Sequence, residues 1–80
     1  MVAHRIPQPL TTFTAGTVVN LSFFALEPAE CQRLRELGVR EGGCVLIMRN
    51  DEAFVCGIDS CRIALRLEVA EHIFGIPGQA

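Results

Sequence analysis

The residues of this sequence with the greatest capacity for chemistry are its four cysteines and two histidines. Three cysteines and one histidine fall in the C-terminal half and form the candidate ligand set for a transition metal: Cys44, Cys56, Cys61 and His72. Structural zinc sites usually contain C-x₂-C pairs, because the short turn presents two sulfurs to one ion. The nearest pair here, Cys56 and Cys61, is more widely spaced. The spacing therefore favours packing of these thiols in the core, with metal ligation as the alternative.

These residues do not form a recognisable catalytic pattern. A cysteine nucleophile requires a nearby histidine and a group that orients it, but His4 lies in the N-terminal segment and His72 near the end of the chain. The segment Arg40–Gly43 lacks the lysine and the glycine spacing of a phosphate-binding loop. We therefore expect no enzymatic activity, and no cofactor other than the alternative metal ion.

Composition and charge narrow the class of protein. The chain has 80 residues, 50% of them hydrophobic, which suits one small globular domain. Its net charge is −2, and its seven basic residues are arginines without a basic cluster, so we expect no nucleic-acid partner. The longest apolar run, Cys44–Met48, is far shorter than the ~20 residues of a membrane span, and the N-terminus has no apolar signal region. We therefore expect a cytoplasmic protein without direct membrane insertion. We also expect all four cysteines to be reduced and at least Cys44 or Cys56 to be buried.

One helix is predicted over residues 27–38. Pro28 suits the first helical position, where its missing N–H group costs nothing, and Gly38 suits a left-handed cap that lets Val39 pack back onto the helix. The spacing of its apolar positions directs two groups of side chains to opposite sides: Cys31, Leu34 and Leu37 towards the core, and Gln32, Arg33, Arg35 and Glu36 towards water.

The other segments are predicted to be strands, because they are rich in β-branched and aromatic residues or alternate in polarity. Their ranges are 17–24, 43–49, 53–59, 61–66 and 73–76, and a short turn over residues 10–16 precedes the first. Val19, Leu21 and Phe23 are expected to face the core from the first strand. The mostly apolar second strand is expected to be covered on both faces.

The segment Cys61–Ile73 changes from strand-like alternation to a helix-like turn without an intervening glycine or proline. We interpret the change as a corner that lets the last strand return and pair, with Leu67 and Ala70 covering the open end of a barrel. Cys61 is expected to share the inner face of its strand with the core residues. The central core residues predicted from the inner faces are Leu34, Ile47, Ile63 and Leu65.

Five short strands at this chain length cannot bury two faces as an open sheet, whereas a small barrel encloses one core. The sequence therefore predicts a mainly β fold, a small SH3-like barrel of about five strands with one inserted helix and a short C-terminal helical turn. We assign residues 1–9 to a flexible N-terminal segment, residues 10–76 to the barrel and residues 77–80 to a tail.

Two blocks of the chain resemble the FeoA family, small cytoplasmic accessory proteins of bacterial ferrous iron uptake. Arg33–Ile47 (RLRELGVREGGCVLI) is similar to the family's pattern of Arg-Leu, then Leu-Gly-hydrophobic, then Gly and a hydrophobic strand. Ile63–Ile73 (IALRLEVAEHI) is similar to its Ala-Leu-Arg, then Ala, then Ile ending. The resemblance covers about residues 10–76. The departures from the pattern lie in loops and caps: Glu41, the short Asn50–Glu52 loop, Ser60 and Glu68.

The resemblance implies a non-catalytic binding module that acts on the cytosolic domain of FeoB, a GTP-dependent membrane transporter. The helix face and the turn after it contain the residues that we assign to partner binding: Arg33, Arg35, Glu36 and Arg40. Arginine suits this role because it is frequent at the energetic centres of interfaces. The alternative function is a small carrier or sensor of iron or zinc that uses Cys and His ligands. Self-association into a homo-oligomer is left open.

The same type of barrel resembles the C-terminal domain of metal-dependent repressors of the DtxR type. No DNA-binding helices precede it in this sequence. We therefore do not expect a stand-alone repressor.

Overall fold

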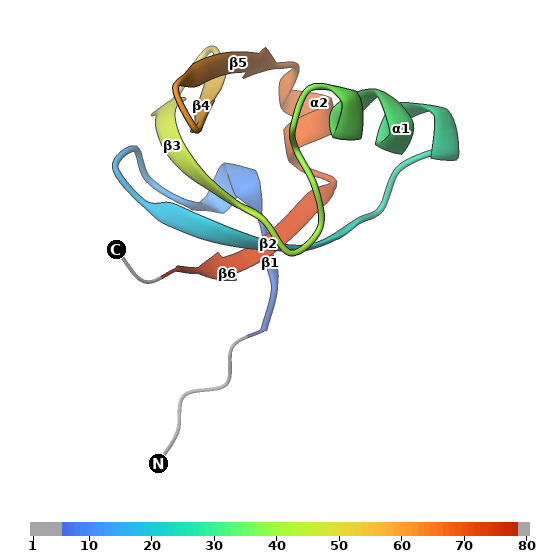
Figure 1. Cartoon of the computed structure of the whole chain (residues 1–80). Helices are drawn as coiled ribbons and strands as arrows, with labels where there is room; N and C mark the ends of the chain where they lie inside the picture. The colour runs from blue at the N-terminus through green and yellow to red at the C-terminus, as the bar shows by residue number, and fades with distance from the viewer. Residues whose placement is uncertain (1–5, 79–80) are drawn as a thin grey trace.

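The computed structural model describes residues 6–78 and shows six strands and two α-helices within that range (Figure 1). The elements follow in the order β1 (Gln8–Pro9), the 3-10 turn η1 (Leu10–Thr12), β2 (Val18–Phe24), α1 (Pro28–Glu36), β3 (Cys44–Asn50), β4 (Phe54–Ile58), β5 (Cys61–Leu65), α2 (Leu67–Ala70) and β6 (Ile73–Pro77). The mainly β fold predicted from the sequence is confirmed. None of the helices in this range is long and apolar enough to cross a membrane.

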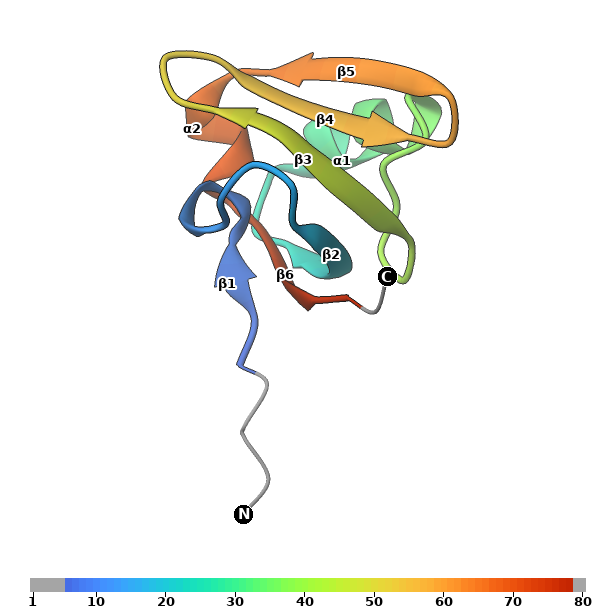
Figure 2. The ribbon, with the colours of Figure 1, turned by 90° about the vertical axis from the view of Figure 1, so that its left-hand side faces the viewer.

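All six strands of the described chain belong to one antiparallel sheet in the order β1-β6-β2-β3-β4-β5. The sheet curls around a single core, with α1 and α2 on one side (Figures 1 and 2). The ring is not closed by strand pairing, because β5 pairs with β4 alone among the described strands. Within the described residues, the outer edge of β5 is therefore unpaired, as is the outer edge of the two-residue strand β1.

Strand β1 is an element that the sequence did not predict. Gln8 is paired with Gly75 and Pro9 with Phe74, so this short strand is joined to the side of β6 that does not face β2. The flexible segment expected over residues 1–9 falls partly on residues 1–5, which lie outside the described residues. The described part of that segment includes a strand.

The core has one continuous cluster of buried side chains drawn from strands β2, β3, β4 and β6, from both helices, and from Leu10 and Val39. The predicted burial of Leu34 and Ile47 is confirmed. Ile63 and Leu65 are only half-buried and pack against the edge of the cluster. Their prediction was wrong in degree, because β5 is an edge strand with a neighbour on one side only.

A β-bulge in β2 changes which aromatic side chain faces the core. The register with β6 shifts between Leu21, which is opposite Gly75, and Phe23, which is opposite Phe74. A bulge inserts one residue and reverses the alternation that follows it. Phe23 is consequently 46% exposed and stacks on the ring of Phe74 at 4.8 Å, while Phe24 packs against the core. The prediction that Phe23 faces inward was wrong.

Strand β3 has one buried face and one exposed face. Val45 and Ile47 are buried, whereas Leu46 and Met48, which alternate with them along the strand, remain on the surface. The expectation that this strand is covered on both faces was wrong. A single curled sheet without a second layer outside it leaves its outer face in water.

Helix α1 begins and ends as its sequence predicts. Pro28 occupies the first turn, and Gly38 follows the helix with a φ of +98°. The Val39 N–H group donates to the Leu34 carbonyl oxygen at 2.8 Å, and the Val39 side chain is buried. Leu37 is 48% exposed, however, so the predicted inward stripe ends at Leu34.

Helix α2 forms the corner between β5 and β6 that the change of periodicity predicted. Ala70 is buried as expected, but Leu67 is on the surface and Val69 is buried in its place. Residues 69, 70 and 73 have the three- and four-residue spacings that bring side chains to one side of a helical turn. Leu67, the first residue of α2, is 38% exposed.

Candidate functional site

Cys56, the central member of the predicted metal set, is fully buried in the core. Burial raises the pKa of its thiol from 9.0 to about 11. A thiol with a raised pKa is protonated at neutral pH, and metal binding requires the thiolate. The placement confirms the prediction that Cys44 or Cys56 is buried and gives Cys56 the character of a core hydrophobe.

The other cysteines lie in different surroundings. Cys44 and Cys61 are exposed, and Cys31 is buried with its thiol 3.6 Å from the Leu26 carbonyl oxygen. All four are free thiols. Cys61 was expected to share the buried face of β5, but it lies beside the turn at the start of that strand, beyond the edge of the core.

His72 lies just after α2, and its ring is oriented by the backbone. Its Nδ1 is 2.7 Å from the Glu68 carbonyl oxygen. Because a carbonyl oxygen only accepts hydrogen bonds, Nδ1 carries a proton and donates it to this carbonyl oxygen. The ring borders a broad surface hollow of about 400 Å³ that is also lined by Phe24–Glu27.

The structure does not bring the four predicted metal ligands together. Within residues 6–78, no three Cys, His, Asp or Glu side chains are grouped so that they could hold one ion. The predicted set is divided between the core (Cys56), the ends of two strands (Cys44 and Cys61) and the α2 corner (His72).

The predicted partner-binding residues are all exposed, but they do not form one uniform surface. Arg35 Nη2 is 3.4 Å from Glu41 Oε2, and Glu36 accepts a hydrogen bond from Gln32 at 3.3 Å. In the part of the chain that the structure describes, Arg33 and Arg40 have neither an ion pair nor a side-chain hydrogen bond. Arg33 and Arg35, two positions apart, lie on different sides of the helix.

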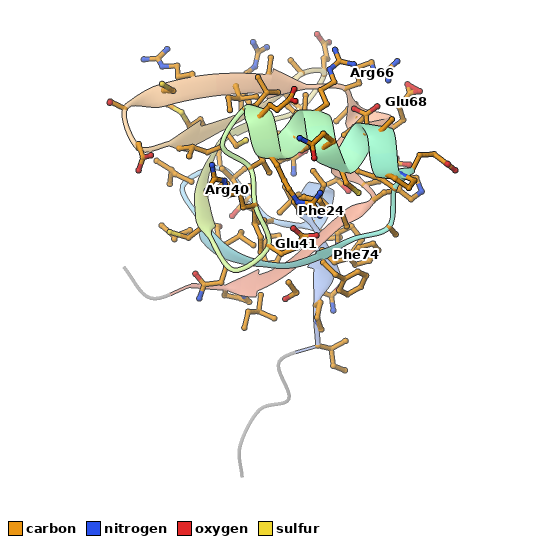
Figure 3. All side chains as sticks on the ribbon, turned by 45° about the vertical axis from the view of Figure 1, so that its right-hand side comes forward. Phe24, Arg40, Glu41, Arg66, Glu68 and Phe74 are labelled. Carbon is orange, nitrogen blue, oxygen red and sulfur yellow. The ribbon has the colours of Figure 1, made fainter. Side chains whose placement is uncertain are left out.

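Arg33 lies beside a groove between α1 and the β5–α2 corner. The groove measures about 160 Å³ and is lined by Glu30, Arg33, Leu34, Leu37, Ala64, Leu65, Arg66 and Val69. Figure 3 shows α1 in front of β5, with Arg66 above the helix and Arg40 and Glu41 on the opposite side of it. The charged face therefore divides into a groove side with Arg33 and a turn side with Arg40.

Sequence reasoning missed the contribution of residues 64–66 to this groove. These residues are about thirty positions from α1 in the sequence, and only the curl of the sheet brings them beside the helix. The resemblance block over residues 63–73 contained them, but it was interpreted as a structural corner. The available signal in that block was Arg66, a charged residue directly after an alternating strand.

Comparison with known proteins supports the family suggested by the two blocks. The FeoA domain profile matches residues 8–77. No curated protein sequence matches the chain.

Solved structures share the fold. An iron uptake regulatory protein (FeoA) superposes with a TM-score of 0.81 at 14% identity, over 90% of this chain and 97% of that one. The solution structure of a FeoA protein from Chlorobium tepidum gives 0.76 at 26% identity, over 86% and 70%. A manganese-dependent transcriptional repressor gives 0.82 at 15% identity, over 96% of this chain but only 45% of its own.

The repressor shares the fold alone at this identity, whereas the family profile spans nearly all the described residues. The structural neighbours from the FeoA family have the SH3-like fold predicted from the sequence. The chain therefore belongs to the FeoA domain family.

Proposed function

We propose that this chain is a non-catalytic accessory protein that acts in the cytoplasm by binding the cytosolic domain of a FeoB-type GTP-dependent transporter. Membership of the FeoA family supports a role in ferrous iron transport. The observation that carries the proposal is the match of the family profile over residues 8–77. The transporter is the partner that the family resemblance implies.

Surface features of the chain support a role in binding. Arg33 and Arg40 have no ion pair within the described residues, so a partner carboxylate would meet them without displacing an internal partner. Leu37 of α1, which is 48% exposed, lines the same groove as Arg33. Arginine beside exposed aliphatic surface is a composition typical of interfaces.

The test is calorimetric titration of the purified cytosolic domain of the cognate transporter with this protein. We expect saturable binding that weakens as salt rises, because the contributing charges are exposed. Arg33→Glu combined with Arg40→Glu is expected to reduce the affinity at least tenfold. Arg49→Glu provides a control with the same charge change per site. Arg49 lies in β3, where its Nε is 3.0 Å from Asp51 Oδ1.

A transporter domain that shows no binding to the wild-type protein would overturn the proposal. Equilibrium dialysis of the reduced protein against ferrous and zinc ions then tests the alternative, a small carrier or sensor of iron or zinc that uses Cys and His ligands. Stoichiometric metal uptake that is lost in Cys44→Ser or Cys61→Ser would favour that alternative.

A further inference from the structure

Strand β5 combines a free sheet edge with the groove beside α1. We propose that this edge binds an extended, acidic segment of a partner protein, which pairs with β5 as an added strand and places an aliphatic side chain in the groove. This inference rests on the proposed function, because the partner tested is the transporter's cytosolic domain. It adds the binding mode and the chemistry of the segment that is bound.

The backbone of β5 has hydrogen-bonding groups that β4 does not use. Ile58 and Cys61 flank the two-residue turn Asp59–Ser60, so they form the closing hydrogen-bonded pair of the hairpin. Antiparallel pairs alternate between hydrogen-bonded and non-hydrogen-bonded. Arg62 and Ala64 occupy the non-hydrogen-bonded positions and direct their N–H and C=O groups away from β4. No other described strand pairs with that side (Figure 2).

The groove next to this edge has an apolar floor. Leu34 of α1 and Val69 of α2 are buried beneath it, and Leu65 of β5 is half-buried. Leu37 forms an exposed apolar rim. A strand that pairs with the edge of β5 projects every second side chain to the inner side of the sheet. Such a side chain, if aliphatic, would cover the floor and the rim together.

The charges that line the groove favour an acidic segment. Arg33 and Arg66 line it with no ion pair or side-chain hydrogen bond in the described range, and Glu30 is the one carboxylate among the lining residues. Arg62 of β5 does not line this groove; it lies beside Leu46 and Met48 in a separate surface hollow. The groove thus carries an excess of positive charge in a chain whose net charge is −2. Carboxylates on the incoming segment would form charge-assisted hydrogen bonds with these arginines.

Two arginines disfavour one way in which a second copy of this chain could pair with this edge. Symmetric antiparallel pairing of two β5 strands about Ala64 would place Arg62 of each copy opposite Arg66 of the other. Like charges in directly opposite positions destabilise a sheet. A short edge strand bearing cations is also how proteins prevent indiscriminate edge pairing. Carboxylates on an acidic strand would instead attract these arginines. The edge would therefore select acidic strands over basic ones.

The decisive measurement is amide hydrogen exchange by NMR, on the free protein and on its complex with the transporter's cytosolic domain. In the free protein, the amides of Arg62 and Ala64 should exchange rapidly, while that of Ile63 is already protected by β4. In the complex, protection at Arg62 and Ala64 should rise at least tenfold, with Ile63 as the internal reference.

Two variants test the same inference by affinity. Ala64→Pro removes the outward N–H group at a position where β4 does not need it, and we expect at least a tenfold loss of binding. Ala15→Pro is the matched control, because Ala15 is the second residue of the Thr14–Thr17 turn, where proline is favoured.

Arg33→Glu combined with Arg66→Glu should weaken binding similarly and remove most of its salt dependence. If Ala64→Pro does not fold, this charge variant and the exchange data decide the question.

The failures are distinguishable. Binding by wild type without new protection at Arg62 and Ala64, and with full affinity in Ala64→Pro, would overturn the strand-addition mode and leave the proposed function standing. Perturbation of groove residues alone would indicate a helical occupant and also overturn it. Protection of these amides in concentrated free protein would identify a second copy as the occupant. Absence of any binding would remove both proposals.

Discussion

The two ends of the curled sheet differ in how completely they are paired. At one end, the two-residue strand β1 covers the outer edge of β6, so that β6 has a partner on each side, and Ile73 and Gly75 within β6 are buried. At the other end, β5 has β4 alone, and Ile63 and Leu65 are half-buried. Figure 1 shows these ends below and above the core, joined by β3. In one small domain, the β6 end provides rigidity while the β5 end retains unused backbone and apolar surface.

The largest expected effect comes from removing the same side chain at each end. Ile73→Ala deletes a fully buried isoleucine and should lower the free energy of unfolding by about 4 kcal/mol. Ile63→Ala removes a half-buried one and should cost about 1–2 kcal/mol, since less apolar surface is lost. Urea unfolding followed by circular dichroism measures both. Equal losses would contradict the difference between the ends.

The next largest effect is expected from replacing a glycine by alanine in each region, Gly75 in β6 and Gly57 in β4. A Cβ at Gly75 would lie 2.5 Å from the Asn20 carbonyl oxygen and 2.6 Å from Val19 Cγ1, and this backbone cannot move aside without disturbing the β2–β6 pairing. We expect Gly75→Ala to cost about 3 kcal/mol. Gly57→Ala is the control, because its closest contact is Met48 Sδ at 3.0 Å, at the end of a flexible side chain. An unchanged unfolding midpoint in Gly75→Ala would show that β6 is not packed tightly against Val19 and Asn20.

Cys56 lies between the two regions and is opposite Ile63, so its thiol reports whether the β5 end stays closed. Burial raises its pKa to about 11, so the folded state holds its proton more tightly than the unfolded chain. The resulting stabilisation is complete below pH 9 and is lost as the pH rises from there through about 11. Between pH 8 and pH 11, the free energy of unfolding should fall more steeply for the wild-type protein than for Cys56→Ala. Parallel pH profiles would indicate that the β5 end opens and exposes the thiol.

The smallest expected effect concerns the link between α1 and the turn before β3. Arg35 and Glu41 form an ion pair at 3.4 Å, and both side chains are well exposed. Exposed pairs contribute less than about 1 kcal/mol. Arg35→Ala should therefore shift the melting temperature by no more than a few degrees, and less still in 1 M salt. A larger or salt-independent loss would show that this turn, which is hydrogen-bonded to Leu21, depends on the helix for its position.

Local patterns in the sequence were reliable where a single element decides the outcome. Pro28, Gly38 and Val39 define the limits of α1 as predicted, because capping depends on backbone geometry within a few residues. The change of period after Leu65 correctly indicated a helical corner. Predictions failed where a second element intervenes. Phe23 faces outward because β2 must shift its register against β6.

The candidate site was predictable only in part. The sequence identified Arg33 as exposed, but it had no means of placing this residue beside one groove with Arg66. It also suggested a ligand set from four residues whose distances depend entirely on the fold. The structure places Cys56 in the core and leaves Cys44 and Cys61 at strand ends.

The sequence by itself determined the class of fold, the position of the helix and the family, because these depend on alternation, capping residues and the order of two short blocks. The tertiary structure decided which strand is left at the edge and which charges remain unpaired. Those properties arise from contacts between segments distant in the chain, as when the curl of the sheet brings β5 beside α1. Pairing between distant strands depends on the whole set of competing contacts, so no local pattern specifies that the ring stops at β5.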